Sequence, residues 1–234
     1  MTTTPGVAVV LPAYNEGERI VATVGAALTL PNVHTVVVVD DGSADDTAAV
    51  AAKAGATVLR HERNRGKAAA METGAQHITD PDMLLLFLDA DLQETATEAA
   101  KLIGPILRDE ADMTIATFPK LPGNKGGGMG FVVRLARWGI VTITGRTMDA
   151  PLSGQRCVRR GVFGAALPLA SGFGVETALT IDVLKAGYRI VEVPTQMAHR
   201  VTGTDLRSQL HRARQWRDVA KALLPRLLKG WSNP

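Results

Sequence analysis

Short apolar runs alternate with segments of helical spacing through the first half of the chain. The runs carry β-branched or aliphatic side chains and almost no polar residues, which is typical of strands that helices cover on both faces. We expect these strands at Val7–Leu11, Val36–Val39, Thr57–Arg60, Met83–Leu88 and Met113–Thr117. We expect helices between them at Asn15–Leu28, Ser43–Ala54, Gly66–His77 and Thr95–Leu107. This alternation predicts an α/β fold with a mostly parallel, nucleotide-binding sheet flanked by helices.

Polar residues mark the beginnings of the first two helices. Asn15 belongs to a residue type that accepts backbone N–H groups at a helix start, and we expect it to cap the first helix. Ser43 and Asp46 have the spacing of a capping box for the second helix, and Gly55 is expected to end that helix.

The alternation breaks after Phe118, where a loop rich in proline and glycine begins. Loops of this length and composition often carry function. Beyond the loop we expect helices at Val132–Ile143 and Glu176–Lys185, strands at Gln155–Val158 and Tyr188–Val193, and a helix at the C-terminal end.

The composition, with 46% hydrophobic and 21% charged residues, is that of an ordinary globular protein. Cys157 is the only cysteine, so no disulfide can form within the chain, and a reducing cytoplasm is the expected compartment. The first residues carry no basic segment ahead of an apolar one, so we expect no signal peptide. The formal net charge is only +3, and we expect no nucleic-acid partner.

The C-terminal segment 204–234 is expected to form a basic amphipathic helix. Its apolar residues recur at spacings of three and four, with arginines between them. Such a stripe could lie peripherally on the inner face of an anionic membrane. It could also pack against the body of the protein or against a second subunit in a homodimer, which is the more ordinary use of an apolar stripe.

Two clusters of aspartate follow predicted strands. Asp40 and Asp41 come directly after the second strand, and Asp89 and Asp91 come directly after the fourth. Since the carboxyl ends of parallel strands meet at one edge of a sheet, we expect these carboxylates to lie near one another there, where open α/β sheets bind ligands. Carboxylates gathered in one place are suited to bind a hard divalent cation, and such an ion can coordinate the oxygens of a diphosphate.

Four motifs in order make the chain similar to a known family. They are Pro12-Ala13-Tyr14-Asn15-Glu16, Asp40-Asp41-Gly42-Ser43, Asn64-Arg65-Gly66-Lys67 and Asp89-Ala90-Asp91. Together they resemble the family 2 glycosyltransferases of GT-A fold, over about the first half of the chain. The resemblance implies a Rossmann-like domain over residues 1–203, followed by the C-terminal helix. Within that domain, residues 1–117 form the nucleotide-sugar-binding half and residues 118–203 the acceptor half.

Further motifs resemble two groups within that family. Asp89-Ala90-Asp91-Leu92-Gln93 and Pro151-Leu152-Ser153-Gly154-Gln155-Arg156 are similar to the polyprenyl-phosphate sugar transferases. The triple glycine Gly126–Gly128, Gly172-Phe173-Gly174-Val175-Glu176 and Ala198-His199-Arg200 are similar to the glucosyl-3-phosphoglycerate synthases. Both groups imply an acceptor that carries phosphate.

Each donor-side motif also has a chemical reason. Pro12, Ala13, Asn15 and Glu16 lie in the first loop above the sheet and are expected to wall the nucleoside. Either Asp40 or Asp41 could accept the imide hydrogen of uracil, because a carboxylate is an acceptor only. Lys67 offers a cation to phosphate at a helix start.

The metal is expected to be Mg²⁺ or Mn²⁺, because hard cations prefer oxygen ligands. Asp91 is expected to bind it directly, and Asp89 to bind the ribose or a metal-bound water. The third ligand is His199 if the phosphoglycerate pattern holds and Gln93 if the polyprenyl-phosphate pattern holds.

On the acceptor side, Glu176 could serve as general base for an alcohol acceptor. A phosphate acceptor is already ionised and needs no base; arginine would then hold it, with Arg156 the best supported candidate. The acceptor site is expected to include Gly127, Gly128, Ser153, Arg156 and Arg200.

The sequence therefore predicts a metal-dependent enzyme that transfers a sugar from a UDP- or GDP-linked donor to a phosphate-bearing acceptor. The rival enzyme class is a sugar-1-phosphate nucleotidyltransferase, which is expected to carry a glycine-rich signature with arginine and lysine in its first loop. A non-catalytic nucleotide-sugar-binding protein is the second alternative, against which the intact Asp89, Asp91 and Glu176 argue.

Overall fold

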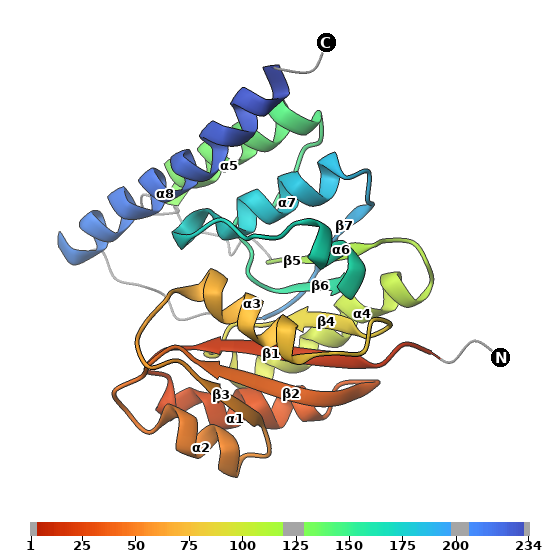
Figure 1. Ribbon diagram of the computed structural model, residues 1–234, viewed down its shortest axis with the longest axis vertical. Helices are drawn as coiled ribbons and strands as arrows, with labels where there is room; N and C mark the ends of the chain where they lie inside the picture. Colours follow the sequence, from red (N-terminus) through yellow and green to blue (C-terminus); the bar gives the residue numbers. More distant parts are fainter. Residues whose placement is uncertain (1–3, 119–128, 198–205, 232–234) are drawn as a thin grey trace.

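The computed structural model describes residues 4–118, 129–197 and 206–231. Its centre is a seven-stranded sheet with helices on both faces (Figure 1). The strands are β1 (Val7–Ala13), β2 (Val33–Asp40), β3 (Thr57–Arg60), β4 (Leu84–Phe87), β5 (Met113–Thr117), β6 (Arg156–Arg159) and β7 (Ile190–Pro194). The α-helices are α1 (Gly17–Leu28), α2 (Thr47–Lys53), α3 (Lys67–His77), α4 (Ala100–Leu107), α5 (Met129–Thr144), α6 (Arg160–Ala165), α7 (Val175–Lys185) and α8 (Leu206–Trp231). Two 3₁₀ helices, η1 (Gln93–Ala99) and η2 (Gly172–Gly174), precede α4 and α7.

The strand order is β3-β2-β1-β4-β6-β5-β7, and β6 alone among these strands is antiparallel to its neighbours. β1 pairs in parallel with both β2 and β4, so the three strands end at the same edge of the sheet. Ala13 stands opposite Asp40 there. The predicted mostly parallel α/β sheet is confirmed, and with it the meeting of the two aspartate-bearing strand ends at one edge.

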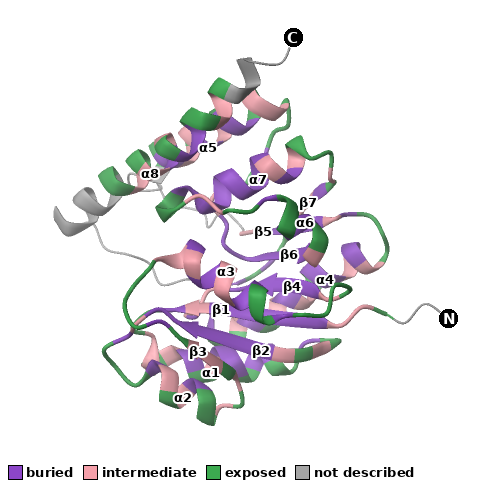
Figure 2. Ribbon diagram, in the orientation of Figure 1, coloured by how far each residue is buried: buried purple, intermediate pink, exposed green. Residues whose placement is uncertain are grey.

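Alternation along the strands divides the core into two layers. In β1, Val7, Val9 and Leu11 face the layer that contains α1 and α4, whereas Ala8 and Val10 face the layer that contains α3, α5 and α7. Every one of these five side chains is fully buried (Figure 2). Burial on both faces explains why the strands read as unbroken apolar runs in the sequence.

The expected N-terminal caps of the first two helices are wrong, whereas Gly55 ends α2 as expected, with a positive φ of 100° directly after the C-cap Ala54. The structure begins α1 after Glu16 and α2 after Asp46, and neither cap residue makes a side-chain hydrogen bond to its helix. Asn15 and Ser43 instead bond to each other's loops across the sheet edge, because the first and second loops lie side by side there. A polar residue near a helix start has several hydrogen-bond partners within reach. Here Asn15 and Ser43 bond to the neighbouring loop instead of capping their own helices.

The C-terminal helix α8 packs against α5, α7 and η2. Val219, Ala222 and Leu223 are buried on its inner face, and Arg226 pairs with Asp182 of α7. The expected packing of this helix on the body is confirmed. Within the described ranges, none of the helices is both long and apolar enough to cross a bilayer.

Candidate active site

Lys67 contacts carboxylates from two distant parts of the chain, Asp89 after β4 and Glu176 in α7. Its Nζ lies 2.6 Å from Asp89 Oδ1 and 3.0 Å from Glu176 Oε1. Gln155 Nε2 donates to the other oxygen of Asp89 at 2.6 Å. These four residues, which we call the Lys67 cluster, come from the start of α3, the turn after β4, the segment before β6 and the first turn of α7. Four motifs that are distant in the sequence thus meet at one point.

Electrostatics keep Lys67 protonated. Burial acts to lower the pKa of its ammonium group, but attraction to Asp89 and Glu176 outweighs burial and raises that pKa above its usual value. The cluster therefore presents a fixed cation between two carboxylates at neutral pH.

Gly154 leaves the space that the cluster needs. A methyl group on its Cα would overlap Lys67 Nζ and lie 3.0 Å from Asp89 Oδ1. The segment Ser153-Gly154-Gln155 can approach Lys67 and Asp89 closely only because this residue has no side chain.

Arg156 does not reach the surface, contrary to the expectation that it binds acceptor phosphate. Its side chain is 1% exposed, with Nε donating to Ser153 O at 2.8 Å and Nη1 to Thr180 Oγ1 at 2.9 Å. Burial lowers the pKa of the guanidinium to about 10, an effect that attraction to Glu176 and Glu192 opposes. Nη2 has no hydrogen-bond partner among the described residues. Arg156 is therefore a buried cation that supports Ser153 and balances Glu176 from the protein side.

Thr23 of α1 holds the Asp89-Ala90-Asp91 turn. Its buried hydroxyl donates to Ala90 O at 2.8 Å and accepts from Gln93 N at 2.8 Å. The sequence analysis missed this residue. The available signal was a hydroxyl on the otherwise apolar inner face of α1, whose other buried members are Ile20, Val24, Ala26 and Ala27.

The turn presents Asp89 and Asp91 at the mouth of the sheet edge, both half-buried. Gln93 is exposed at the start of η1 and has a positive φ of 53°. Across residues 4–118, 129–197 and 206–231, no three His, Cys, Asp or Glu side chains gather as a metal site. The donor set still fits Mg²⁺ or Mn²⁺, because these ions commonly take one or two carboxylates and complete their shell with water and substrate phosphate.

Asp41 organises the loop after β3. Its Oδ1 lies 2.7 Å from His61 Nδ1 and accepts from Arg65 N at 2.9 Å, while Oδ2 accepts from Gly66 N at 2.7 Å. His61 Nε2 lies 2.9 Å from Thr73 Oγ1, so this histidine connects Asp41 to α3. The hydrogen bonds fix the backbone that leads into Lys67.

Asp40 is fully buried beside this loop. Its Oδ1 accepts from Ser43 N at 2.9 Å. Its Oδ2 lies 3.2 Å from Arg60 Nε, close enough for an ion pair but without the alignment of a hydrogen bond. Of Asp40 and Asp41, only Asp40 thus has an oxygen that accepts no hydrogen bond from the part of the chain that the structure describes.

The first loop is tied to the second. Asn15 N donates to Ser43 Oγ and Ala44 N donates to Asn15 Oδ1, both at 2.9 Å, and Glu16 N donates to Thr47 Oγ1 at 2.9 Å. Pro12 and Glu16 are half-buried, Ala13 is buried and Asn15 is exposed. The predicted nucleoside-binding residues of this loop thus stand beside Asp40 and Asp41 at the sheet edge.

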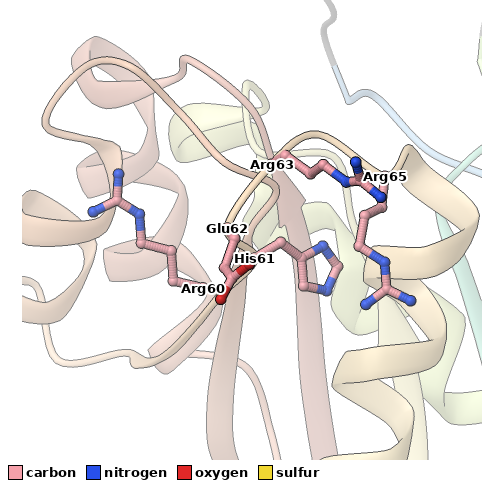
Figure 3. Close-up of a pocket in the computed structure, with 5 residues that line it drawn as sticks. All are labelled: Arg60, His61, Glu62, Arg63 and Arg65. Atoms are coloured by element: carbon pink, nitrogen blue, oxygen red, sulfur yellow. The ribbon is translucent and has the colours of Figure 1, made fainter.

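A basic pocket of about 270 Å³ opens at the loop that follows β3 (Figure 3). It is lined by Arg60, His61, Glu62, Arg63 and Arg65. Arg60 is committed to Asp40 and to Ser43 O. The lining residues stand at the end of β3, beside the loop that Asp41 organises. The pocket therefore belongs to the predicted donor side of the sheet edge and includes no residue of the Lys67 cluster.

Four predicted site residues lie outside the described ranges. They are Gly127, Gly128, His199 and Arg200.

The family model for glycosyl transferase family 2 matches residues 8–130. The chain belongs to glycosyl transferase family 2. It is a glycosyltransferase, which sets aside the nucleotidyltransferase alternative. Glycosyltransferase AglJ of Haloferax volcanii is 31% identical over 213 residues, which cover 88% of this chain and 67% of that protein.

Other relatives carry both of the resemblances seen in the sequence. Glucosyl-3-phosphoglycerate synthase of Mycobacterium tuberculosis is 29% identical over 75% of this chain and 60% of its own length. An undecaprenyl-phosphate 4-deoxy-4-formamido-L-arabinose transferase of Sodalis glossinidius is 35% identical over 44% of this chain and 34% of its own length. This chain thus spans between a third and two thirds of these family 2 relatives.

Solved structures of the mycobacterial synthase have the same fold. A complex with Mn²⁺, UDP-glucose and phosphoglyceric acid superposes with a TM-score of 0.77 at 27% identity, covering 95% of this chain and 80% of the synthase chain. A complex of the same synthase with Mg²⁺ and UDP also has a TM-score of 0.77. The expected GT-A fold is confirmed.

Proposed function

We propose that this family 2 glycosyltransferase moves a sugar from a UDP-sugar to a phosphate-bearing acceptor, with Mg²⁺ or Mn²⁺ bound at the Asp89-Ala90-Asp91 turn. The observation that carries the proposal is the Lys67 cluster, in which Lys67 contacts Asp89 on the donor side and Glu176 on the acceptor side. Such a contact between the two halves marks the place where a sugar would pass from one to the other.

UDP is the donor nucleotide that the relatives support best, because the mycobacterial synthase binds UDP and UDP-glucose in its crystals; GDP is the alternative. The base would lie against Pro12, Ala13, Asn15 and Glu16, with the imide hydrogen directed to Asp40 or Asp41. Asp40 Oδ2 accepts no hydrogen bond within the described structure, whereas both oxygens of Asp41 already accept at least one.

Asp91 is proposed to bind the ion directly. Asp89 is already committed to Lys67 and Gln155, so it suits the ribose or a metal-bound water. The third protein ligand would be His199 or Gln93. When bound, the ion acts as a Lewis acid that stabilises the departing nucleoside diphosphate. Thr23 would keep Asp89 and Asp91 in place while charge develops on the leaving group.

Lys67 is proposed to attract the phosphates of donor and acceptor, because its ammonium group lies between the two sides and stays protonated. Glu176 orients Lys67, and it would be the base only for an alcohol acceptor. The acceptor phosphate would meet Gly127, Gly128, Ser153 and Arg200. Arg156 would support Ser153 by donating to its backbone O.

Product mass spectrometry tests the proposal. The protein is incubated with Mn²⁺ and either UDP-glucose, another UDP-sugar or GDP-mannose, in the presence of a polyprenyl phosphate or of 3-phosphoglycerate. We expect one acceptor to gain a glycosyl residue from a UDP-sugar. Transfer to neither acceptor from any donor would contradict the proposal, and transfer from GDP-mannose alone would correct its donor. NMR of the product anomer shows whether the reaction retains or inverts configuration.

A further inference from the structure

Helices α5 and α8 lie side by side as an outer layer of the acceptor half (Figure 1). Their outward faces carry large apolar side chains with high exposure, which we call the α5–α8 face. Its apolar members are Phe131, Trp138 and Val141 of α5 and Trp216, Leu224 and Leu228 of α8. Phe131 is 68% exposed and Leu228 is 62% exposed.

The core does not account for these side chains. Val132, Ala136 and Ile140 of α5 and Val219 and Leu223 of α8 already fill the interface with the body. The exposed residues are additional to those that fill this interface. Large apolar side chains gathered on one face of a folded protein mark an interaction surface.

The charge on this face has one sign. Its exposed ionisable residues are Arg134, Arg214, Arg217 and Lys221. The sequence of α5 contains no acidic residue, and that of α8 contains only Asp218, which pairs with Arg217 at 3.1 Å and whose Oδ2 lies 3.4 Å from Phe173 N of η2. The partner must therefore offer apolar contact and negative charge together.

We infer that the α5–α8 face docks peripherally on an anionic lipid surface. Tryptophan and leucine side chains enter the boundary between headgroups and acyl chains, while arginine and lysine attract anionic headgroups. A second copy of this chain fits less well, because a twofold interface would bring the same cations against one another.

The inner side of α8, beneath the α5–α8 face, borders the proposed acceptor site. Helix α8 packs on η2, and a methyl group on Gly174 would lie 2.7 Å from Asp218 O. Glu176 follows η2 by two residues. Docking through this face would bring the segment that leads into Glu176 close to the membrane, which suits a lipid-linked phosphate acceptor. This last step rests on the proposed function, whereas the docking itself does not.

Vesicle flotation tests the inference without any turnover. The full chain is mixed with vesicles of phosphatidylcholine alone or of phosphatidylcholine with phosphatidylglycerol. Two variants are compared with the parent, Leu224→Gln/Leu228→Gln on the apolar part and Arg217→Glu/Lys221→Glu on the basic part. Leu28→Gln and Lys53→Glu are matched controls, because both are exposed on α1 and α2 at the far end of the molecule.

We expect binding to the anionic vesicles, weakened by salt, and at least about tenfold weaker binding for both double variants with no change for the controls. Binding that is absent, indifferent to lipid charge or equal in the parent and the double variants would overturn the inference. A dimer that dissociates in the double variants would also overturn it, since the face would then be a subunit interface. Measurement of UDP affinity on the same samples separates failure of docking from failure of the donor site.

Discussion

Lys67 Nζ lies 2.6 Å from Asp89 Oδ1, although the two residues stand 22 positions apart and belong to different motifs. The side chains of this ion pair remain 31% and 28% exposed, so solvent screens the pair and it contributes little to folding by itself. Its importance lies in position, because the same ammonium group also reaches Glu176 at 3.0 Å and so couples the donor and acceptor sides.

Gly154→Ala tests the Lys67 cluster. The added methyl group would displace Lys67 Nζ from Asp89, and a flexible lysine can move away at little cost to stability. We expect UDP affinity to fall about tenfold or more, since a charge-assisted contact is lost, with an almost unchanged melting temperature. Gly161→Ala is the control, because no atom lies within 4 Å of the added group. Equal UDP affinity in parent and Gly154→Ala would show that donor binding does not depend on the cluster.

Glu176→Gln distinguishes the two acceptor chemistries. Because Lys67 already occupies one Glu176 oxygen, we expect turnover with the true acceptor to fall by less than about tenfold. Loss of an essential base would instead lower kcat by about 100-fold or more while UDP affinity stayed constant. Steady-state kinetics at saturating donor give the answer, and the larger loss would assign Glu176 to proton removal from a hydroxyl.

Thr23→Val removes the hydroxyl that holds the Asp89-Ala90-Asp91 turn while keeping the shape of the side chain. We expect the free energy of unfolding to fall by about 1–3 kcal/mol, because Ala90 O and Gln93 N lose their partner. We also expect KM for the UDP-sugar to rise, and Thr23→Ser to restore it. Thr29→Val is the control at the C-cap of the same helix, where the hydroxyl donates to Ala26 O. If Thr23→Ser restores stability but not KM, the positioning role is wrong.

Arg156 variants separate a supporting role from acceptor binding. Arg156→Ala should lower the free energy of unfolding by about 2–5 kcal/mol, because it leaves a cavity and removes the donors to Ser153 O and Thr180. Arg156→Met fills more of the space and should cost less. If an Arg156 variant is as stable as the parent but has a higher KM for the acceptor alone, Arg156 binds the acceptor and the supporting role is wrong.

The pH dependence of these variants follows from the lowered pKa of Arg156, about 10. Below that value the guanidinium is charged in the folded and the unfolded protein alike, so the cost of burying its charge is constant. The cost is relieved only as pH rises above about 10, where the folded protein releases the proton first. The difference in unfolding free energy between parent and Arg156→Met should therefore stay level from about pH 6 to pH 9 in chemical denaturation.

The sequence supports the fold well because burial on both faces leaves an unmistakable apolar run for each strand. It also places Asp40, Asp41, Asp89 and Asp91 correctly, since strand direction alone brings strand ends to one edge. The position of β6 between β4 and β5 could not be predicted, because its four residues do not reveal their direction.

The missed contacts are all long-range. The sequence predicts that Lys67 meets phosphate but not that it contacts Glu176, and Thr23 reads as one more residue of an apolar helix face until the fold brings Ala90 to it. Arg156 reads as a surface cation because arginine is seldom buried, and only the packing of α7 shows otherwise. Local patterns specify elements, whereas side-chain partners depend on tertiary structure.

Metal-dependent transfer in Asp91→Asn measures the central claim most directly. Sugar transfer from the UDP-sugar to the phosphate acceptor is followed by mass spectrometry in the parent and in Asp91→Asn, with Mn²⁺ and with EDTA. We expect EDTA to abolish transfer by the parent, and Asp91→Asn to lose at least about 100-fold in rate while keeping the parent's melting temperature. Transfer that proceeds equally with EDTA, or equally in Asp91→Asn, would contradict the account.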